Sequence, residues 1–177
     1  MAHAPDHDAV LIVGAYGTGK TSVAIEMAGI LEDAGLSYAL LDLDFQGWVS
    51  LEDHDEHEHP RFLLANLAAV VSNYRAAGVR FFVLAGFVGG PASLQAIRDV
   101  VDMPLRVVRL EVPWPEIERR LRADVTTGRQ HDLRESKQQL ASAEGVGLED
   151  RIVQNDRPLQ EVATELVGWL GWDNGPR

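Results

Sequence analysis

Short apolar runs alternate with longer amphipathic segments along this chain. Five runs have the length of buried strands and span residues 9–13, 38–43, 80–84, 105–111 and 151–154. Apolar residues recur with helical period at 20–34, 61–77, 93–101, 115–125, 133–144 and 158–170. Apolar strands separated by helices are typical of a parallel sheet covered on both faces. The pattern therefore predicts one three-layer α/β domain over residues 1–177, with five core strands.

Composition and charge narrow the expected partners. The 177 residues are 46% hydrophobic and 24% charged, which suits a domain with its own core. Sixteen basic against 27 acidic residues give a net charge of −11, so nucleic acid and anionic membranes would be repelled. We therefore expect small-molecule partners, no nucleic acid and no membrane; the oligomeric state stays open. The chain has no cysteine and no basic, apolar leader at its start, so we expect a cytoplasmic protein.

A glycine-rich motif follows the first predicted strand and opens the first predicted helix. It reads GAYGTGKT and matches the phosphate-binding pattern G-x-x-x-x-G-K-[ST]. In such loops backbone N–H groups turn toward phosphate oxygens, and the helix N-terminus favours negative charge. Lys20 would reach the β- and γ-phosphates of a nucleotide, and the Thr21 hydroxyl would ligate Mg²⁺. The predicted nucleotide-binding residues are Gly14, Ala15, Tyr16, Gly17, Thr18, Gly19, Lys20, Thr21 and Ser22. A glycine-rich turn that binds nothing is the structural alternative.

Two acids end the second predicted strand, in the sequence LDLD. Because strand side chains alternate, Asp42 and Asp44 should point to the same side of the carboxyl edge, where open α/β sheets bind ligands. Either could hold Mg²⁺ or accept a proton from an attacking hydroxyl. We favour Asp44 as the catalytic acid because it lies further out of the strand. The alternative is that one of the two caps a turn or a helix.

Arginines cluster around residues 126–131, TTGRQH, between two predicted helices. A mobile arginine-bearing segment can close over a nucleotide and stabilise charge on a transferring phosphoryl group. We predict such a lid over about 119–134. Its candidate arginines are Arg119, Arg120, Arg122, Arg129 and Arg134. The alternative is a solvated helix face on which these arginines pair with Glu116 and Glu118.

Two further loops carry weaker signals. Residues 51–59, LEDHDEHEH, follow the Asp pair and suggest a solvated loop, a substrate-side loop or a metal site. The sequence QNDRP joins the last strand to the last helix, so Asn155 and Arg157 could contact the base of a nucleotide. A turn with a helix cap explains Asn155 and Asp156 equally well.

Together these motifs resemble those of the small P-loop kinases of the nucleoside-monophosphate-kinase-like group, such as adenylylsulfate, gluconate and shikimate kinases. The resemblance implies a P-loop NTPase fold with sheet order 2-3-1-4-5, ATP and Mg²⁺ at the loop, and an acid at the end of the second strand, which Asp44 matches. It implies catalytic lid roles for Arg120, Arg122 and Arg129, and contact of residues 155–158 with adenine. The implied activity is transfer of the γ-phosphoryl group to a small hydroxyl or phosphate acceptor.

The acceptor and the choice between ATP and GTP are not specified by these motifs. Residues 85–90, AGFVGG, follow the third predicted strand, where such kinases commonly recognise the acceptor, and they offer almost no polar side chains. The string DLDFQGW also resembles partition-type ATPases, which are nucleotide-dependent switches that act through a protein partner. Those proteins carry a signature lysine where this chain has Ala15, and we keep the switch as the alternative function. A nucleic-acid kinase is disfavoured by the charge of −11.

Overall fold

A single parallel sheet forms the centre of the protein. The computed structural model describes residues 7–47, 59–123, 129–142 and 147–173. The strands are β1 (Asp8–Val13), β2 (Tyr38–Asp42), β3 (Phe81–Ala85), β4 (Leu105–Glu111) and β5 (Arg151–Gln154). All neighbouring strands pair in parallel, in the order β2-β3-β1-β4-β5. The predicted five-stranded sheet and its order are confirmed.

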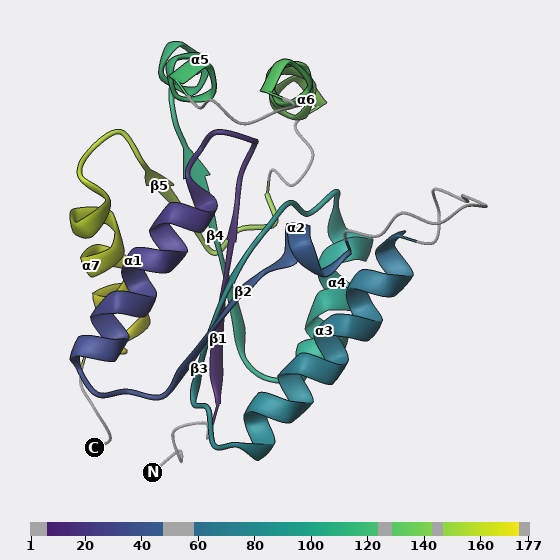
Figure 1. Cartoon of the computed structure of the whole chain (residues 1–177), viewed down its shortest axis with the longest axis vertical. Helices are drawn as coiled ribbons and strands as arrows, with labels where there is room; N and C mark the ends of the chain where they lie inside the picture. Colours follow the sequence, from purple (N-terminus) through teal and green to yellow (C-terminus); the bar gives the residue numbers. More distant parts are fainter. Residues whose placement is uncertain (1–6, 48–58, 124–128, 143–146, 174–177) are drawn as a thin grey trace.

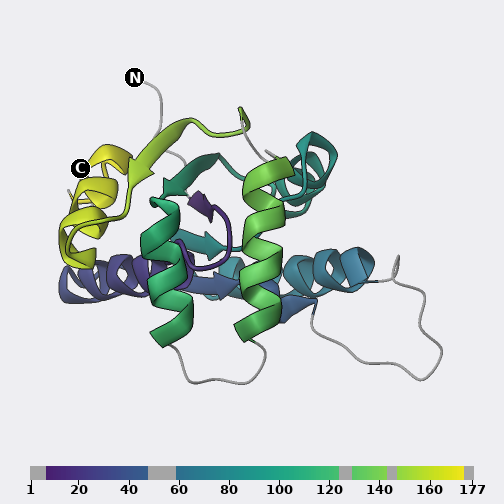
Figure 2. The same cartoon turned by 90° about the horizontal axis from the view of Figure 1, so that it is seen from above.

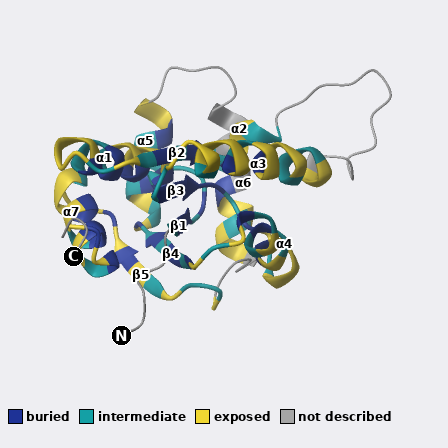
Figure 3. Ribbon diagram, turned by 90° about the horizontal axis from the view of Figure 1, so that it is seen from below, coloured by how far each residue is buried: buried dark blue, intermediate teal, exposed yellow. Residues whose placement is uncertain are grey.

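Helices cover both faces of this sheet. They are α1 (Lys20–Asp33), α2 (Leu43–Gln46), α3 (His59–Ala76), α4 (Pro91–Val101), α5 (Trp114–Ala123), α6 (Arg129–Ser142) and α7 (Leu159–Leu170). Helices α1 and α7 lie against one face, and α3 and α4 lie against the other (Figure 1). Their outward surfaces are exposed, whereas the strands between them are largely buried (Figure 3). No helix in the described ranges is both long and apolar enough to cross a membrane.

The apolar strands supply two separate cores. Val10 and Ile12 of β1 pack toward α1 and α7, while Ala9 and Leu11 pack toward α3 and α4. Because strand side chains alternate, a strand buried on both faces needs an apolar residue at every position. All five residues of β3, FFVLA, are buried accordingly. The continuous apolar runs in the sequence therefore follow from helices on both sides.

Helices α5 and α6 stand above the carboxyl edge of the sheet (Figures 1 and 2). They form a third apolar cluster, built on Val112, Ile117 and Leu121 with Trp114 and Leu133 packed against it. Figure 2 shows the two helices on opposite sides of the loop that follows β1. This arrangement holds them over the place where the glycine-rich loop leaves the sheet.

Several predicted boundaries differ from the observed ones by one to four residues, and two of these differences affect the site. Strand β2 ends at Asp42 rather than Leu43, and the next four residues form the short helix α2. Asp44 therefore lies in a helix, so strand alternation does not set its direction. Helix α6 begins at Arg129, so the last residues of the predicted interruption at 126–131 are helical. Residues 124–128 fall outside the described part.

Candidate functional site

The loop between β1 and α1 is folded as a compact turn with an open helix end. Gly17 and Gly19 have φ angles of 82° and 89°, in the left-handed region that a Cβ disfavours. The hydroxyl and amide of Thr18 donate to the Ala15 carbonyl at 2.8 and 3.2 Å. The first backbone bond into α1 runs from the Val23 amide to the Gly19 carbonyl, at 2.9 Å. The N–H groups at 20–22 therefore have no helical acceptor, which suits an anion.

The ammonium group of Lys20 lies at the centre of this loop. The residue is 6% exposed, and its Nζ donates to the Ala15 carbonyl at 3.4 Å. Nζ also lies 5.1 Å from the centroid of the Tyr16 ring. Burial lowers the pKa of Lys20, and the charges of Asp44 and Asp42 oppose this shift. Among the described residues no carboxylate forms an ion pair with Lys20. A buried cation of this kind fits a polyphosphate.

Thr21 and Asp42 bring oxygen atoms together beside the lysine. The Thr21 hydroxyl donates to Asp42 Oδ2 at 2.7 Å, and Asp42 Oδ1 accepts from the Asp44 amide at 3.0 Å. Asp42 is thus the cap of α2, as the alternative interpretation of the acid pair expected, while its second oxygen faces Thr21. A hydroxyl and a carboxylate are ligands that Mg²⁺ accepts, so this pair fits the predicted metal.

Asp44 lies at the edge of a cavity of about 580 Å³, which we call the Asp44 pocket. Its Oδ1 accepts from the Phe87 amide at 3.3 Å, so the loop after β3 holds the carboxylate. Loss of solvent around the carboxyl, together with the negative charge of Asp42, raises the pKa of Asp44. The charge of Lys20 and the Phe87 amide oppose that rise. The charges of both acids therefore act on Lys20, and helix capping rather than strand alternation sets where the acids lie.

Asn155 connects the loop after β5 to the glycine-rich loop. Its side chain is buried, and Nδ2 donates to the Thr18 carbonyl at 2.7 Å. A Cβ on Gly19 would lie 2.7 Å from the same Nδ2, so only glycine leaves room for this contact. Sequence reasoning considered a base contact or a cap for Asn155 and missed this brace. Nothing local to QNDRP signals a partner 137 residues away.

The structure separates the predicted arginines into different settings. Arg120 donates through Nη2 to the Asn155 carbonyl and through Nε to Glu116, both at 2.7 Å. Arg119 pairs with Glu116 and Arg122 pairs with Glu118, and both arginine side chains are more than two-thirds exposed. Arg120 is therefore the α5 arginine that the structure brings to the glycine-rich loop.

Of the three remaining predicted arginines, the structure describes the side chains of two. Arg157 pairs with Glu165 of α7. Arg134 is exposed on α6, and the side chain of Arg129 lies outside the described part. The His-rich segment 51–59 is likewise undescribed, apart from the backbone of His59, the first residue of α3.

Helix α6 contacts the glycine-rich loop through two uncharged residues. The Ser136 hydroxyl donates to the Tyr16 carbonyl at 2.8 Å, and Gln139 accepts from the Tyr16 amide at 3.0 Å. Ser136 is fully buried by this contact. Sequence reasoning assigned only arginines to the lid and missed both residues, because neither belongs to a motif.

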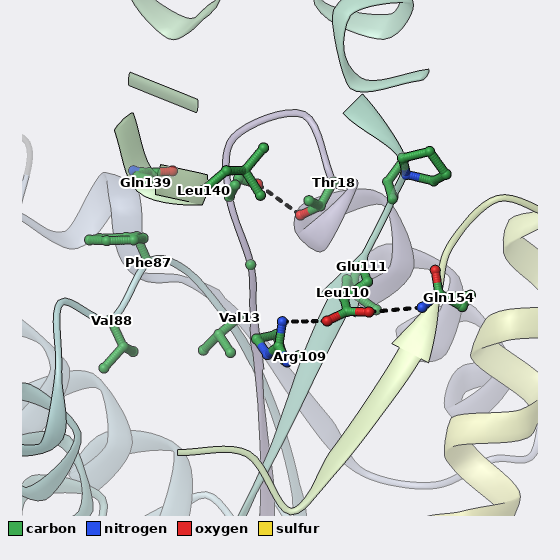
Figure 4. A pocket seen from close by; sticks show the side chains of 14 residues that line it. Val13, Thr18, Phe87, Val88, Arg109, Leu110, Glu111, Gln139, Leu140 and Gln154 are labelled. Atoms are coloured by element: carbon green, nitrogen blue, oxygen red, sulfur yellow. Dashed lines mark hydrogen bonds and ion pairs between the residues drawn. The ribbon is translucent and has the colours of Figure 1, made fainter. Parts of the chain in front are cut away.

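A second cavity of about 350 Å³ is also lined by Phe87 (Figure 4). Arg109 bridges Glu111 at 2.6 Å and Glu149 at 3.2 Å on its wall, and Gln154 donates to Glu111 at 2.9 Å. Phe87 lines both cavities and so forms a shared wall. In contrast to the Asp44 pocket, the charges here are paired with one another.

No protein-family model and no curated sequence matches the chain, whereas solved structures do. Among solved structures, a sugar kinase from Janibacter sp. is 21% identical, covers 93% of this chain and 95% of its own, and has a TM-score of 0.63.

Two other solved structures are similar to the same extent. The tunicamycin resistance protein of Deinococcus radiodurans is 17% identical, with coverage of 93% and 96% and a TM-score of 0.65. The Mycobacterium tuberculosis APS kinase, solved with AMPPNP and APS, is 20% identical, with coverage of 95% and 99% and a TM-score of 0.60. The sheet order and these similarities agree, and the chain has the fold of the P-loop small-molecule kinases.

Proposed function

We propose that this protein is an ATP–Mg²⁺-dependent kinase that transfers the γ-phosphoryl group to a small acceptor bearing a hydroxyl or phosphate group. The observation that carries the proposal is the buried ammonium of Lys20, the first residue of α1. It has no ion-pair partner among the described residues, and the charge of Asp44 acts on it. An anion in the loop would supply the missing counter-charge. The cavity beside Asp44 would supply room for an acceptor.

On the nucleotide side, Lys20 and the N–H groups at the start of α1 bind the β- and γ-phosphates. Thr21 and Asp42 hold Mg²⁺, which supplies positive charge to the phosphate oxygens when bound. Asn155 keeps the loop in shape through the Thr18 carbonyl. Arg120 lies next to the loop, and its guanidinium stabilises charge that develops on the transferring group. Helices α5 and α6 serve as the lid over about 119–134.

On the acceptor side, Asp44 orients the attacking hydroxyl and accepts its proton. A carboxylate works best as a general base when its pKa approaches the working pH, and the pKa of Asp44 is shifted in that direction. The Phe87 amide fixes one carboxylate oxygen, so the other is left for the acceptor. This division of labour favours a kinase over a switch that acts through a protein partner, since a switch needs no acceptor cavity at the catalytic acid.

The chain offers a matched pair of lysines to test the nucleotide assignment, because Lys20 and Lys137 are its only two. We expect ATP with Mg²⁺ to raise the melting temperature of the wild type and of Lys137→Met, but not of Lys20→Met. Without nucleotide, Lys20→Met should melt at the same or a higher temperature. Burial lowers the pKa of Lys20, so at neutral pH its charge costs folding free energy.

Two outcomes would contradict the kinase proposal. Equal stabilisation of Lys20→Met and the wild type by ATP would remove the nucleotide assignment. ADP release that no sugar, nucleoside, antibiotic or apolar alcohol in a broad panel accelerates would remove the phosphotransferase assignment, even if ATP binds.

A further inference from the structure

The Asp44 pocket has apolar walls. It lies between α2, α3 and α4, and apolar side chains form most of its surface. They include Leu43, Leu63, Leu64, Phe87, Ala96 and Ile97. Among the described residues that line it, Asp44 is the only charged one, and the other polar side chains belong to Tyr16 and Ser93.

This lining discriminates against anionic and highly hydroxylated acceptors. A carboxylate or phosphate on the acceptor would meet Asp44 and, in the described lining, no cation. A polyol would leave most of its hydroxyls against hydrocarbon, which costs free energy because they exchange water for no partner. Burying an alkyl or aryl group in the same space is favourable in proportion to the apolar area removed from water.

Size and position define the remaining features of the acceptor. A cavity of about 580 Å³ lies within the range of pockets that hold drug-sized molecules. The carboxylate of Asp44 is held at the edge by the Phe87 amide, and the charge of Lys20 acts on it. A single hydroxyl on an apolar body would therefore meet its one acidic partner at the side of the pocket nearest the phosphate loop.

We propose that the acceptor is an uncharged alcohol with an apolar alkyl or aryl body that fills the Asp44 pocket. The proposal rests on the kinase function above. In the transfer, the alcohol oxygen forms a new bond to the γ-phosphorus, and the bond from that phosphorus to the β,γ-bridging oxygen breaks. The hydroxyl proton passes to the Asp44 carboxylate. A phosphate monoester and ADP leave.

Binding and turnover can be measured with matched probes. Phenylpropanol carries one hydroxyl on an apolar body, para-carboxyphenylpropanol adds a single negative charge, and glycerol is a small polyol. Isothermal titration calorimetry of each probe into the full chain saturated with AMPPNP and Mg²⁺ measures binding without turnover. We expect phenylpropanol to bind at least about tenfold more tightly than the other two. With ATP, it should also accelerate ADP release.

Filling the pocket provides the structural control. Ala96→Leu places three extra carbons in the cavity, while Ala69→Leu makes the same change at an exposed position of α3 outside it. Ala96→Leu should weaken phenylpropanol binding by about tenfold and leave AMPPNP binding unchanged, whereas Ala69→Leu should change neither. Ala92→Leu, at an exposed position in the same lining, serves if Ala96→Leu does not fold.

The outcomes separate the two proposals. The proposal of an apolar acceptor is overturned if para-carboxyphenylpropanol binds as tightly as phenylpropanol or more tightly. It is also overturned if neither filling variant changes the binding of phenylpropanol. If glycerol or para-carboxyphenylpropanol accelerates ADP release and phenylpropanol does not, the proposal of an apolar acceptor is overturned as well, whereas the kinase function is retained. Phenylpropanol binding that the filling variants weaken, without any acceptor-dependent ADP release, contradicts the kinase function and with it the role of this ligand as acceptor.

Discussion

The side-chain amide of Asn155 donates a 2.7 Å hydrogen bond to the carbonyl of Thr18 and so ties the loop after β5 to the glycine-rich loop. Arg120 of α5 also holds Asn155, through a hydrogen bond of 2.7 Å to its carbonyl. The glycine-rich loop is thus supported by Asn155 directly and by Arg120 through Asn155, and both residues follow Thr18 by more than a hundred positions. Its shape depends on these tertiary contacts as well as on its glycines.

Removing this brace should weaken nucleotide binding. We expect Asn155→Ala to lower ATP affinity by about tenfold, because the Thr18 carbonyl loses its partner and the loop loses its support. Titration calorimetry with ATP and Mg²⁺ measures this change. Asp156→Ala, at the exposed neighbouring position, is the matched control and should bind like the wild type. If Asn155 positions the nucleotide-binding loop, Asn155→Ala should raise the KM for ATP and leave the KM for the acceptor unchanged. Equal increases in both KM values would argue against this role.

Arg120 and Arg119 give a sharp test of the lid assignment, since both donate to Glu116 but only Arg120 reaches Asn155. We expect Arg120→Ala to reduce turnover by about a hundredfold because charge on the transferring group loses a donor. Arg119→Ala should retain nearly full turnover. Steady-state ADP release with a productive acceptor makes the comparison. Comparable losses in the two variants would mean that α5 contributes only through its fold.

The titration of Asp44 should appear in both activity and stability. The pKa of Asp44 lies above the ordinary aspartate value near 3.8. Turnover should therefore fall as the pH drops through this raised pKa, because the general base becomes protonated. Asp44→Asn should abolish this activity. The same shift means that the ionised carboxyl costs folding free energy at neutral pH. Asp44→Asn should therefore melt at a higher temperature than the wild type at neutral pH.

The pH dependence of that stability gain checks its cause. The difference in melting temperature between Asp44→Asn and the wild type should shrink as the pH falls through the raised pKa toward the ordinary value. Asp33→Asn, at the exposed end of α1, is the matched control for removal of one carboxylate charge. A variant that is less stable than the wild type at neutral pH would refute the electrostatic explanation.

Gly86 sets the distance between β3 and α2. A Cβ at this position would lie 2.7 Å from the Cβ of Leu43, the residue before Asp44. We expect Gly86→Ala to cost about 1–3 kcal/mol of unfolding free energy and to lower turnover, because overpacking displaces α2 and its acid. Urea unfolding and ADP release measure the two effects. Gly29→Ala in α1, where nothing lies within 4 Å of the added carbon, should be neutral or stabilising.

The sheet could be predicted from the sequence because the signal of each strand, a short apolar run, lies within a few consecutive residues. Every residue of β3 is apolar since helices cover both of its faces, and this pattern is visible in FFVLA itself. The conformation of the glycine-rich loop could be predicted equally well, because it depends on glycines at fixed spacing. Both signals lie within a few consecutive residues.

The contacts that complete the site could not be predicted in the same way. The alternating sequence LDLD suits a strand, but the Asp42 side chain captures the Asp44 amide and turns the backbone into α2. Contacts of Asn155 with Thr18 and of Ser136 with Tyr16 join residues more than a hundred positions apart. Such contacts form only when the helices and loops pack against the sheet. The sequence around Asn155 or Ser136 contains no motif from which the contacting residue could be predicted.

Tyr16 joins three parts of the molecule in one residue. Its backbone is held at both polar atoms by α6, its ring lies against the Lys20 ammonium, and its side chain lines the Asp44 pocket. The position of α6 therefore bears on the surroundings of Lys20 and on the wall of the Asp44 pocket through the same residue. Under the proposed function, nucleotide and acceptor would lie on either side of one aromatic side chain.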